Sequence, residues 1–104
     1  MIYLASPYTD PNPMIQGLRV RIVSEWIGTQ IEWYNYFSPV LYGVSLECHV
    51  GGTFYAWQHF NRNMIDRLDS FAVLQIEGWD RSEGVIGELD YAIKQGKSIE
   101  YIAL

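Results

Sequence analysis

A carboxylate near the start of a predicted helix is the residue best placed to do chemistry. In GWDRSEGVIGELDYAIKQGK, residues 78–97, a turn leads into a predicted helix over 83–95 that carries Glu88. The helix dipole alone favours a carboxylate near a helix N-terminus, by less than about 1 kcal/mol, which is a purely structural explanation. However, Glu88 lies at the edge of the apolar stripe formed by Val85 and Leu89. A partly desolvated carboxylate there is expected to look along the top of a sheet, where it can act as a nucleophile or an electrostatic stabiliser.

Residues on neighbouring predicted elements supply partners for this carboxylate. Tyr3 belongs to the first predicted strand, residues 2–5, and its hydroxyl is expected to reach toward Glu88 from the centre of the sheet. Ser82 is the predicted N-cap of the helix, and Gly84 allows a ligand to approach the backbone closely. Free amides at a helix N-terminus form an anion site, so the sequence predicts a carboxylate beside an anion-binding turn.

Alternating apolar runs and amphipathic segments must position these residues. Strands are predicted over 2–5, 36–40, 70–76 and 98–104, helices over 14–33, 54–68 and 83–95, and a loop over 41–53. The helices rest on apolar residues spaced three and four apart. The alternation predicts an α/β fold, a small doubly wound (flavodoxin/Rossmann-like) parallel sheet of about four strands with helices on both faces. The chain of 104 residues is expected to form a single domain, 1–104.

Further candidate residues follow the predicted strands, because ligands of such sheets bind beyond the carboxyl ends of the strands. The segments at those ends are 5–10, 38–53 and 77–84. Ser6 and Ser38 are candidate contacts to a phosphate or a sugar, and Trp79 is a candidate stacking wall. Each has a structural alternative, since turn hydroxyls often satisfy the backbone and a tryptophan can anchor a turn.

Charge and cysteine content limit the class of partner. With 7 basic and 12 acidic residues the net charge is −5, so a nucleic-acid polymer is not expected to bind, whereas a small nucleotide stays possible. The single cysteine, Cys48, cannot form an internal disulfide, and neither a signal peptide nor a membrane span is indicated, which favours the cytoplasm. No His and Cys spacing matches a zinc site, so no metal is expected. The 16 aromatic residues favour a homodimer or a higher homo-oligomer.

Several motifs together resemble a known family. They are the opening MIYLASPYTDP, the FSPV segment at 37–40, and the C-terminal half with Gly-Trp at 78–79, Ser-x-Gly-Val-x-x-Glu at 82–88 and a Gly-Lys turn into the last strand. These motifs resemble the nucleoside 2-deoxyribosyltransferase superfamily, in particular small phage and bacterial members related to nucleoside 5′-monophosphate N-hydrolases. The similarity spans nearly the whole chain, and its most specific part is the Ser-x-Gly-Val-x-x-Glu element after Gly-Trp.

The resemblance implies cleavage or transfer of the N-glycosidic bond of a nucleoside or nucleoside 5′-monophosphate, without a cofactor. Glu88 matches the glutamate that attacks C1′ or stabilises the oxocarbenium ion, and Tyr3 matches the tyrosine that orients it. Ser82 stands where the 5′-monophosphate hydrolases carry serine and the classical transferases carry aspartate, so it leans toward a substrate with a phosphate. Water as the acceptor gives a hydrolase, and a second base gives a transferase.

One position departs from the family pattern. Members usually carry an aspartate eight residues before the strand-leading aspartate, here Asp69, and that residue helps to protonate the leaving base; this chain has Asn61 instead. An amide can contact a base but cannot act as a general acid. His59 or Asp66 could supply the proton.

The departure keeps other functions open. The rival function is a non-catalytic nucleotide-binding module of the same fold, and a third is a structural subunit with a vestigial pocket. A phosphoribohydrolase of the lysine-decarboxylase-like fold is less supported, because its usual Pro-Gly-Gly-x-Gly-Thr motif is absent. A dinucleotide site is poorly supported, because no Gly-x-Gly-x-x-Gly follows the first strand.

Overall fold

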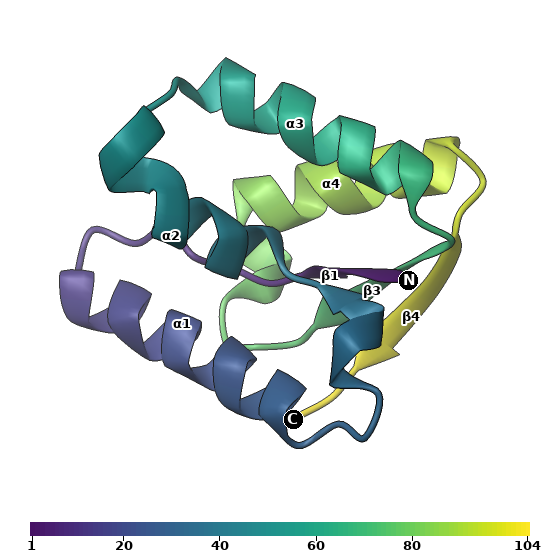
Figure 1. Ribbon diagram of the computed structural model, residues 1–104, viewed down its shortest axis with the longest axis horizontal. Coiled ribbons are helices and arrows are strands. Elements are labelled where there is room, and N and C mark those ends of the chain that lie inside the picture. Colours follow the sequence, from purple (N-terminus) through teal and green to yellow (C-terminus); the bar gives the residue numbers. More distant parts are fainter.

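Four parallel strands form the centre of the molecule (Figure 1). The computed structural model describes the backbone of residues 1–104 and every side chain except those of Cys48 and Phe54, so the prediction about Cys48 lies outside the described side chains. The strands are β1 (Ile2–Ala5), β2 (Tyr36–Phe37), β3 (Ser70–Leu74) and β4 (Ser98–Ile102), in the order β2-β1-β3-β4. The predicted α/β fold with a parallel sheet of four strands is confirmed.

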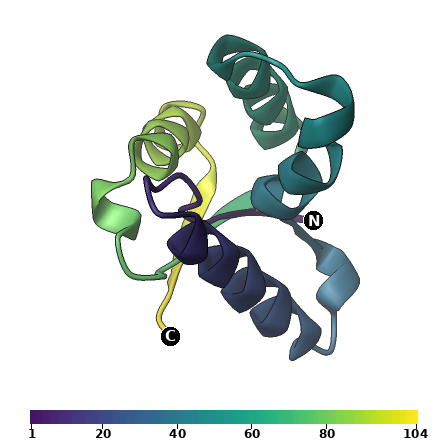
Figure 2. The same cartoon turned by 90° about the vertical axis from the view of Figure 1, so that its left-hand side faces the viewer.

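Helices cover both faces of this sheet, as predicted. They are α1 (Pro13–Gly28), α2 (Pro39–Val50), α3 (Phe54–Arg67) and α4 (Glu83–Lys94), with short 3-10 turns at Trp33–Asn35 and Trp79–Arg81. Figures 1 and 2 show α3 and α4 side by side over one face and α1 on the other, with α2 near the end of the sheet where β1 leads into the loop before α1. None of the helices in the described chain combines the length and the apolar character that crossing a membrane requires.

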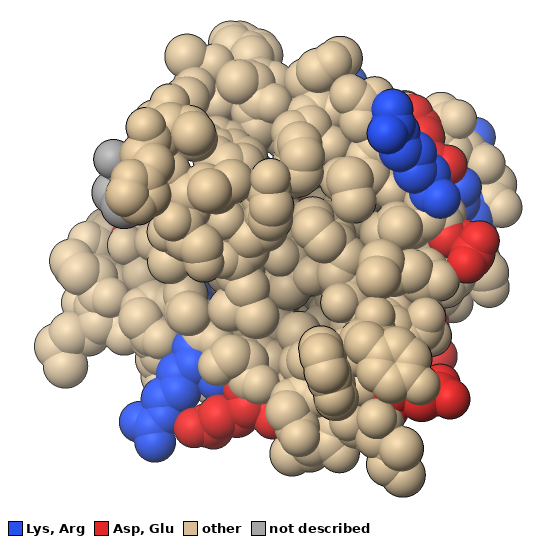
Figure 3. All heavy atoms as spheres, viewed as in Figure 1, with Lys and Arg blue, Asp and Glu red and all other residues tan. Residues whose placement is uncertain are grey.

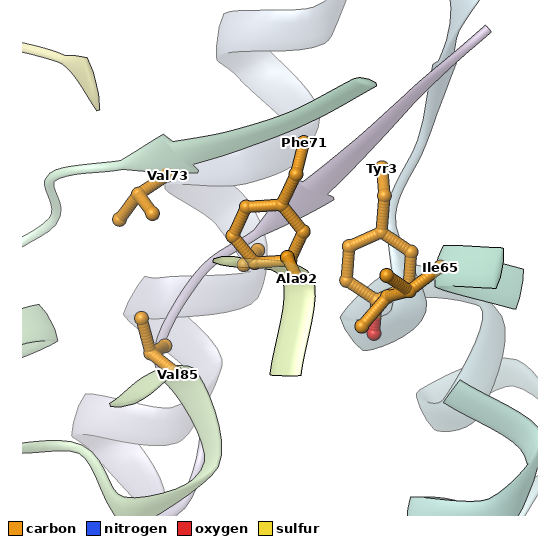
Figure 4. Packing of buried hydrophobic residues seen from close by; sticks show 7 residues of the cluster. Tyr3, Ile65, Phe71, Val73, Val85 and Ala92 are labelled. Atoms are coloured by element: carbon orange, nitrogen blue, oxygen red, sulfur yellow. The ribbon is translucent and has the colours of Figure 1, made fainter. Parts of the chain in front are cut away.

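Side-chain alternation along the two central strands divides the core into two layers. Tyr3 of β1 and Phe71 of β3 point toward α3 and α4, whereas Leu4 and Ala72, one residue further along each strand, point toward α1. Tyr3 and Phe71 are register partners, and their rings stack with centroids 5.3 Å apart (Figure 4). Tyr3 is therefore enclosed by buried apolar groups, and its hydroxyl is buried as well.

The predicted loop over 41–53 is wrong, because residues 39–50 form helix α2. Ser38 caps this helix, its Oγ accepting a hydrogen bond from the Leu41 amide at 3.2 Å, and Pro39 occupies the first helical position, where its missing amide costs nothing. Gly43 lowers helix propensity but does not end the helix. Gly51, with a positive φ of 60°, ends it instead.

Two other predicted boundaries extend too far. The strand predicted over 36–40 stops at Phe37, since Ser38 turns the chain into α2. The helix predicted over 14–33 ends at Gly28, where the Thr29 hydroxyl donates to the Trp26 carbonyl at 2.6 Å and closes the last turn. The remaining helices and strands agree with the predicted ranges to within two residues.

The strand order creates a crevice between β1 and β3, because the chain leaves these two neighbouring strands toward opposite faces. Arg19 of α1 joins the two segments that follow them: it donates to the Thr9 carbonyl at 2.9 Å and to the Glu77 carbonyl at 3.4 Å. Glycine is favoured at position 78 by its φ of 93°, which other residues rarely adopt, and an added Cβ atom would also displace the Arg19 guanidinium, 2.7 Å away. The two segments are thus fixed beside each other at the carboxyl edge of the sheet.

We predict that Lys97→Met destabilises the protein by about 1–2 kcal/mol, because two charge-assisted hydrogen bonds are lost at a partly buried site. The Lys97 ammonium donates to the Asp66 carbonyl at 3.0 Å and the Leu68 carbonyl at 2.9 Å, and so ties the end of α3 to the turn before β4. Urea unfolding measures the change. Lys94→Met is the matched control, since Lys94 forms a surface ion pair with exposed Asp90. Equal losses in both variants would contradict the assignment.

Candidate active site

A cavity of about 600 Å³ lies at the carboxyl edge of the sheet. Its walls come from the loop after β1, the inner face of α2, the first half of α3 and the N-terminal half of α4. The lining residues are Ser6, Tyr8, Thr9, Pro39, Val40, Gly43, Val44, Glu47, Trp57, Gln58, Asn61, Arg62, Arg81, Ser82, Glu83, Gly84, Val85, Gly87 and Glu88. Predicted site residues from the loop after β1, from α3 and from the start of α4 therefore meet at one place, the place where this topology binds ligands.

Glu88 has the most perturbed carboxyl group of this cavity. Burial of the carboxyl raises its pKa from 4.5 to about 7, and hydrogen bonding by Tyr3 and by Asn61 opposes that rise. The residue as a whole is partly exposed, because one side of it faces the open cavity. Near neutral pH the group therefore exchanges between a carboxylic acid and a carboxylate, which suits either a nucleophile or an acid.

The Tyr3 hydroxyl is a buried donor directed at this carboxyl. Burial, followed by the negative charge of Glu88, raises the pKa of the Tyr3 phenol well above its usual value, so the hydroxyl keeps its proton. Its oxygen makes no hydrogen bond of good geometry among the described atoms, although Glu88 lies close enough to raise the pKa of the phenol by its charge and by a weaker hydrogen-bonding interaction. An unpaired buried hydroxyl costs stability, so a well-formed hydrogen bond from Tyr3 to the carboxylate would be favourable.

Asn61 approaches Glu88 from α3. Its Nδ2 donates to Glu88 Oε1 at 3.4 Å, a long hydrogen bond that joins the two helices across the floor of the cavity. Asn61 is half-buried, and it lies one helical turn after Gln58, which lines the same wall. The amide can hold the carboxylate and contact a ligand, but it cannot supply a proton.

The other end of the cavity suits an anion. Ser82 is the N-cap of α4, as predicted, and its Oγ accepts from the Val85 amide at 3.3 Å. Gly84 leaves the first turn of the helix uncovered on the cavity side, where backbone amides and the dipole favour negative charge. Ser6 lines the same cavity, and its buried Oγ has no hydrogen-bond partner among the described atoms. Arg81 adds a positive charge at this end.

The family comparison gives one result. The model of the family described as "Domain of unknown function (DUF1937)" matches residues 37–103. The chain belongs to this family. The match includes Asn61, Ser82 and Glu88 and leaves out Tyr3 and Ser6, which precede it. A search of the curated proteins finds no match. The description of the DUF1937 family names no reaction, so the geometry of the cavity is what bears on function.

Some predicted site residues of this DUF1937 chain lie outside the cavity. Trp79 packs against the core beside Tyr101, with ring centroids 5.9 Å apart. Ser38 borders a separate, more open hollow of about 430 Å³ between β2 and α2, and its hydroxyl caps α2. The two alternative acids are also directed elsewhere, because His59 contacts Asn63 and Asp66 accepts from Tyr91 at 2.8 Å.

The sequence reasoning missed the wall formed by α2. Val40, Gly43, Val44 and Glu47 all line the cavity, but the sequence predicts Val40 at the end of a strand and the other three in a loop. Their spacing of three, one and three residues is the helical repeat that would have identified this face. Among the described side chains, no group of three His, Cys, Asp or Glu residues is arranged to hold a metal ion.

Lys and Arg side chains form no continuous patch on the face seen in Figure 3, where they stand at separate places near the rim. The expectation that a nucleic-acid polymer does not bind stays a prediction.

Proposed function

We propose that the chain cleaves or transfers the N-glycosidic bond of a nucleoside or nucleoside 5′-monophosphate, with Glu88 as the nucleophile or electrostatic stabiliser. The observation that carries the proposal is a single carboxyl group with a pKa of about 7, between a buried tyrosine hydroxyl and a donating amide on the floor of a nucleotide-sized cavity. The resemblance to the deoxyribosyltransferase superfamily supports it through the same residues. The same proposal includes a small nucleoside or nucleotide as the partner, the cytoplasm as the location of the protein, and a homo-oligomer as its assembly.

The chemistry needs few groups. The leaving base takes the bonding electrons from C1′, and positive charge develops on the sugar. The Glu88 carboxylate stabilises that charge or forms an ester with C1′, while the Tyr3 hydroxyl holds the carboxylate in place. Water or a second base then attacks C1′. The sugar is transferred to this acceptor, and the Glu88 carboxylate is set free. No metal or cofactor takes part in this scheme.

The anion-binding end of the cavity supports a 5′-phosphate on the substrate. The free amides of the α4 N-terminus, the unpaired Ser6 hydroxyl and the Arg81 guanidinium can together receive phosphate oxygens. Ser6 follows β1 and Ser82 precedes α4, so a phosphate between them would bridge the crevice that Arg19 holds together.

We predict that kcat/KM for base release rises with pH through about 7 and then levels off, since the free protein needs Glu88 ionised and the pKa of Glu88 is about 7. The Tyr3 hydrogen bond lowers this pKa, so Tyr3→Phe is expected to shift the rising limb to higher pH. Initial rates between pH 5 and 9 measure both. A rate that falls with rising pH would instead assign Glu88 as a general acid.

A binding module remains the second candidate because of Asn61. With His59 and Asp66 directed away from the cavity, no described side chain replaces the family aspartate beside Glu88 as a proton donor to the leaving base. Such a protein would hold a nucleotide without turning it over.

Base release from purified protein tests the proposal directly. A panel of ribo- and deoxyribonucleosides and their 5′-monophosphates is incubated with protein and analysed by chromatography, with and without a second free base as acceptor. Free base from a monophosphate but not from the nucleoside supports a phosphate-dependent hydrolase, and base exchange supports a transferase. A thermal shift on adding a nucleotide, without any base release, would replace the enzyme by the binding module.

A further inference from the structure

We infer that α2 forms the base-binding wall of the cavity and that Glu47 selects bases that carry an exocyclic amino group. The inference rests on the proposed function, since it names the substrate class of the same cavity. α2 is the cavity wall that takes no part in the proposed bond cleavage or in the binding of an anion.

The inner face of α2 is suited to a flat ring. Val40, Gly43, Val44 and Glu47 follow one another at helical spacing, so they share one face, and all line the cavity. Val40 and Val44 offer apolar surface, and between them Gly43 leaves a gap, since a Cβ atom built there meets nothing within 4 Å. A planar heterocycle fits against two branched side chains separated by a glycine.

The two ends of this face differ in chemistry. α2 begins directly after Phe37, whose ring lies 5.7 Å from that of Tyr3, so its first turn is at the Glu88 end of the cavity. Glu47 lies seven residues after Val40, about 10 Å further along the helix axis. Helical side chains lean toward the N-terminus of their helix, so the Glu47 carboxylate is directed back over Gly43 and Val44. A base joined to a sugar at Glu88 would thus direct its far edge at Glu47.

Glu47 is available to a ligand. It is exposed, and it has no ion pair and no side-chain hydrogen bond with the part of the chain that the structure describes. The opposite wall offers no competing donor from Trp57, whose indole N–H already donates to the Gly51 carbonyl at 3.1 Å. Trp57 therefore offers its apolar ring to the cavity.

A carboxylate accepts hydrogen bonds and cannot donate them. It accepts from the amino group of adenine or cytosine, as carboxylates do in base recognition, whereas the carbonyl of hypoxanthine or uracil would face it as a second acceptor. The cavity is therefore expected to favour adenine over hypoxanthine and cytosine over uracil, pairs that differ in this group and in the proton on the neighbouring ring nitrogen.

The test compares adenosine with inosine 5′-monophosphate and cytidine with uridine 5′-monophosphate. Dissociation constants by calorimetry and kcat/KM for base release are measured for the wild type, Glu47→Gln and Glu83→Gln. We expect the wild type to prefer the amino member of each pair by about tenfold, and Glu47→Gln to bring the ratio near one, because an amide can donate as well as accept. Glu83→Gln removes the same charge from the first turn of α4, away from α2, and is expected to keep the wild-type ratio.

Binding and turnover separate the two proposals. An amino preference in binding that Glu47→Gln removes supports the inference, even if no base is released and the proposed enzyme activity fails. Base release with an unchanged ratio in Glu47→Gln overturns the inference and leaves the enzyme. A wild type that prefers the carbonyl member, binds none of the four nucleotides, or loses its preference equally in both variants also overturns it.

Discussion

Glu88→Gln is expected to reduce base release by at least about a thousandfold, because the amide can neither attack C1′ nor offset the charge of the oxocarbenium ion. Glutamine keeps the shape of the side chain and can still accept a hydrogen bond from Asn61, so the cavity is expected to stay intact. Base release by chromatography measures the effect. Asp90→Asn is the matched control, since Asp90 lies on the same helix and pairs with Lys94 at the surface.

The same substitution is expected to stabilise the folded protein at neutral and alkaline pH. Burial raises the pKa of Glu88 from 4.5 to about 7, so between these values the folded state holds a proton that the unfolded state releases, and stability falls as pH rises. Above about pH 7 the carboxylate form costs about 3 kcal/mol if fully buried, and about 1–2 kcal/mol after allowance for its exposed side. Glutamine has no such cost.

Urea unfolding at pH 4 and pH 8 checks this second effect. The gain in Glu88→Gln is expected to be small at pH 4, where the glutamate is protonated in both states, and largest at pH 8. A residue that reduces activity when replaced and stabilises the fold when neutralised is retained for function. A variant that is inactive and less stable at pH 8 would return Glu88 to the structural explanation offered by the helix dipole.

The sequence predicts the sheet and the position of Glu88 well because both depend on local signals. β1 and β3 are short, continuous apolar runs that are buried on both faces of the sheet. Such runs are typical of the central strands of a parallel sheet, so the sequence predicts them directly. Ser82 marks the start of α4 as its N-cap, and Glu88 lies about one helical turn after the core residue Val85. These relations are set within a few residues of chain.

The wall formed by α2 could not be predicted in the same way, because competing local signals surround it. Gly43 and the pair Gly51-Gly52 indicate a loop, and only the first is inside the helix. The apolar stripe indicates that Glu88 is partly desolvated, but the size of its pKa shift depends on the long-range packing of α3 against α4 and has no local signal in the sequence. The packing of Trp79 is not predictable either, because its position in a turn does not indicate the direction in which the ring packs.

Asn61→Asp is expected to increase base release by about a hundredfold, since a positioned general acid commonly contributes between about 10² and 10⁴ to such reactions. The Asn61 amide nitrogen lies 3.4 Å from Glu88 Oε1, so an aspartate there places two carboxyl groups around one proton. Like charges at that distance cannot both ionise readily, so the pair is expected to keep one proton near neutral pH. One carboxylate can then attack C1′ while the other protonates the leaving base.

The pH profile distinguishes this gain from a general change in the cavity. A single rising limb in the wild type is expected to become bell-shaped in Asn61→Asp, with the falling limb reporting loss of the shared proton. Asn63→Asp is the control, because Asn63 lies two residues further along α3, is exposed, and has its side-chain hydrogen bond with His59. If Asn61→Asp releases base where the wild type releases none, Asn61 is what separates a binding module from an enzyme in this fold. If it leaves the rate unchanged or lowers it, the leaving base draws its proton from solvent, and Asn61 serves only to hold Glu88.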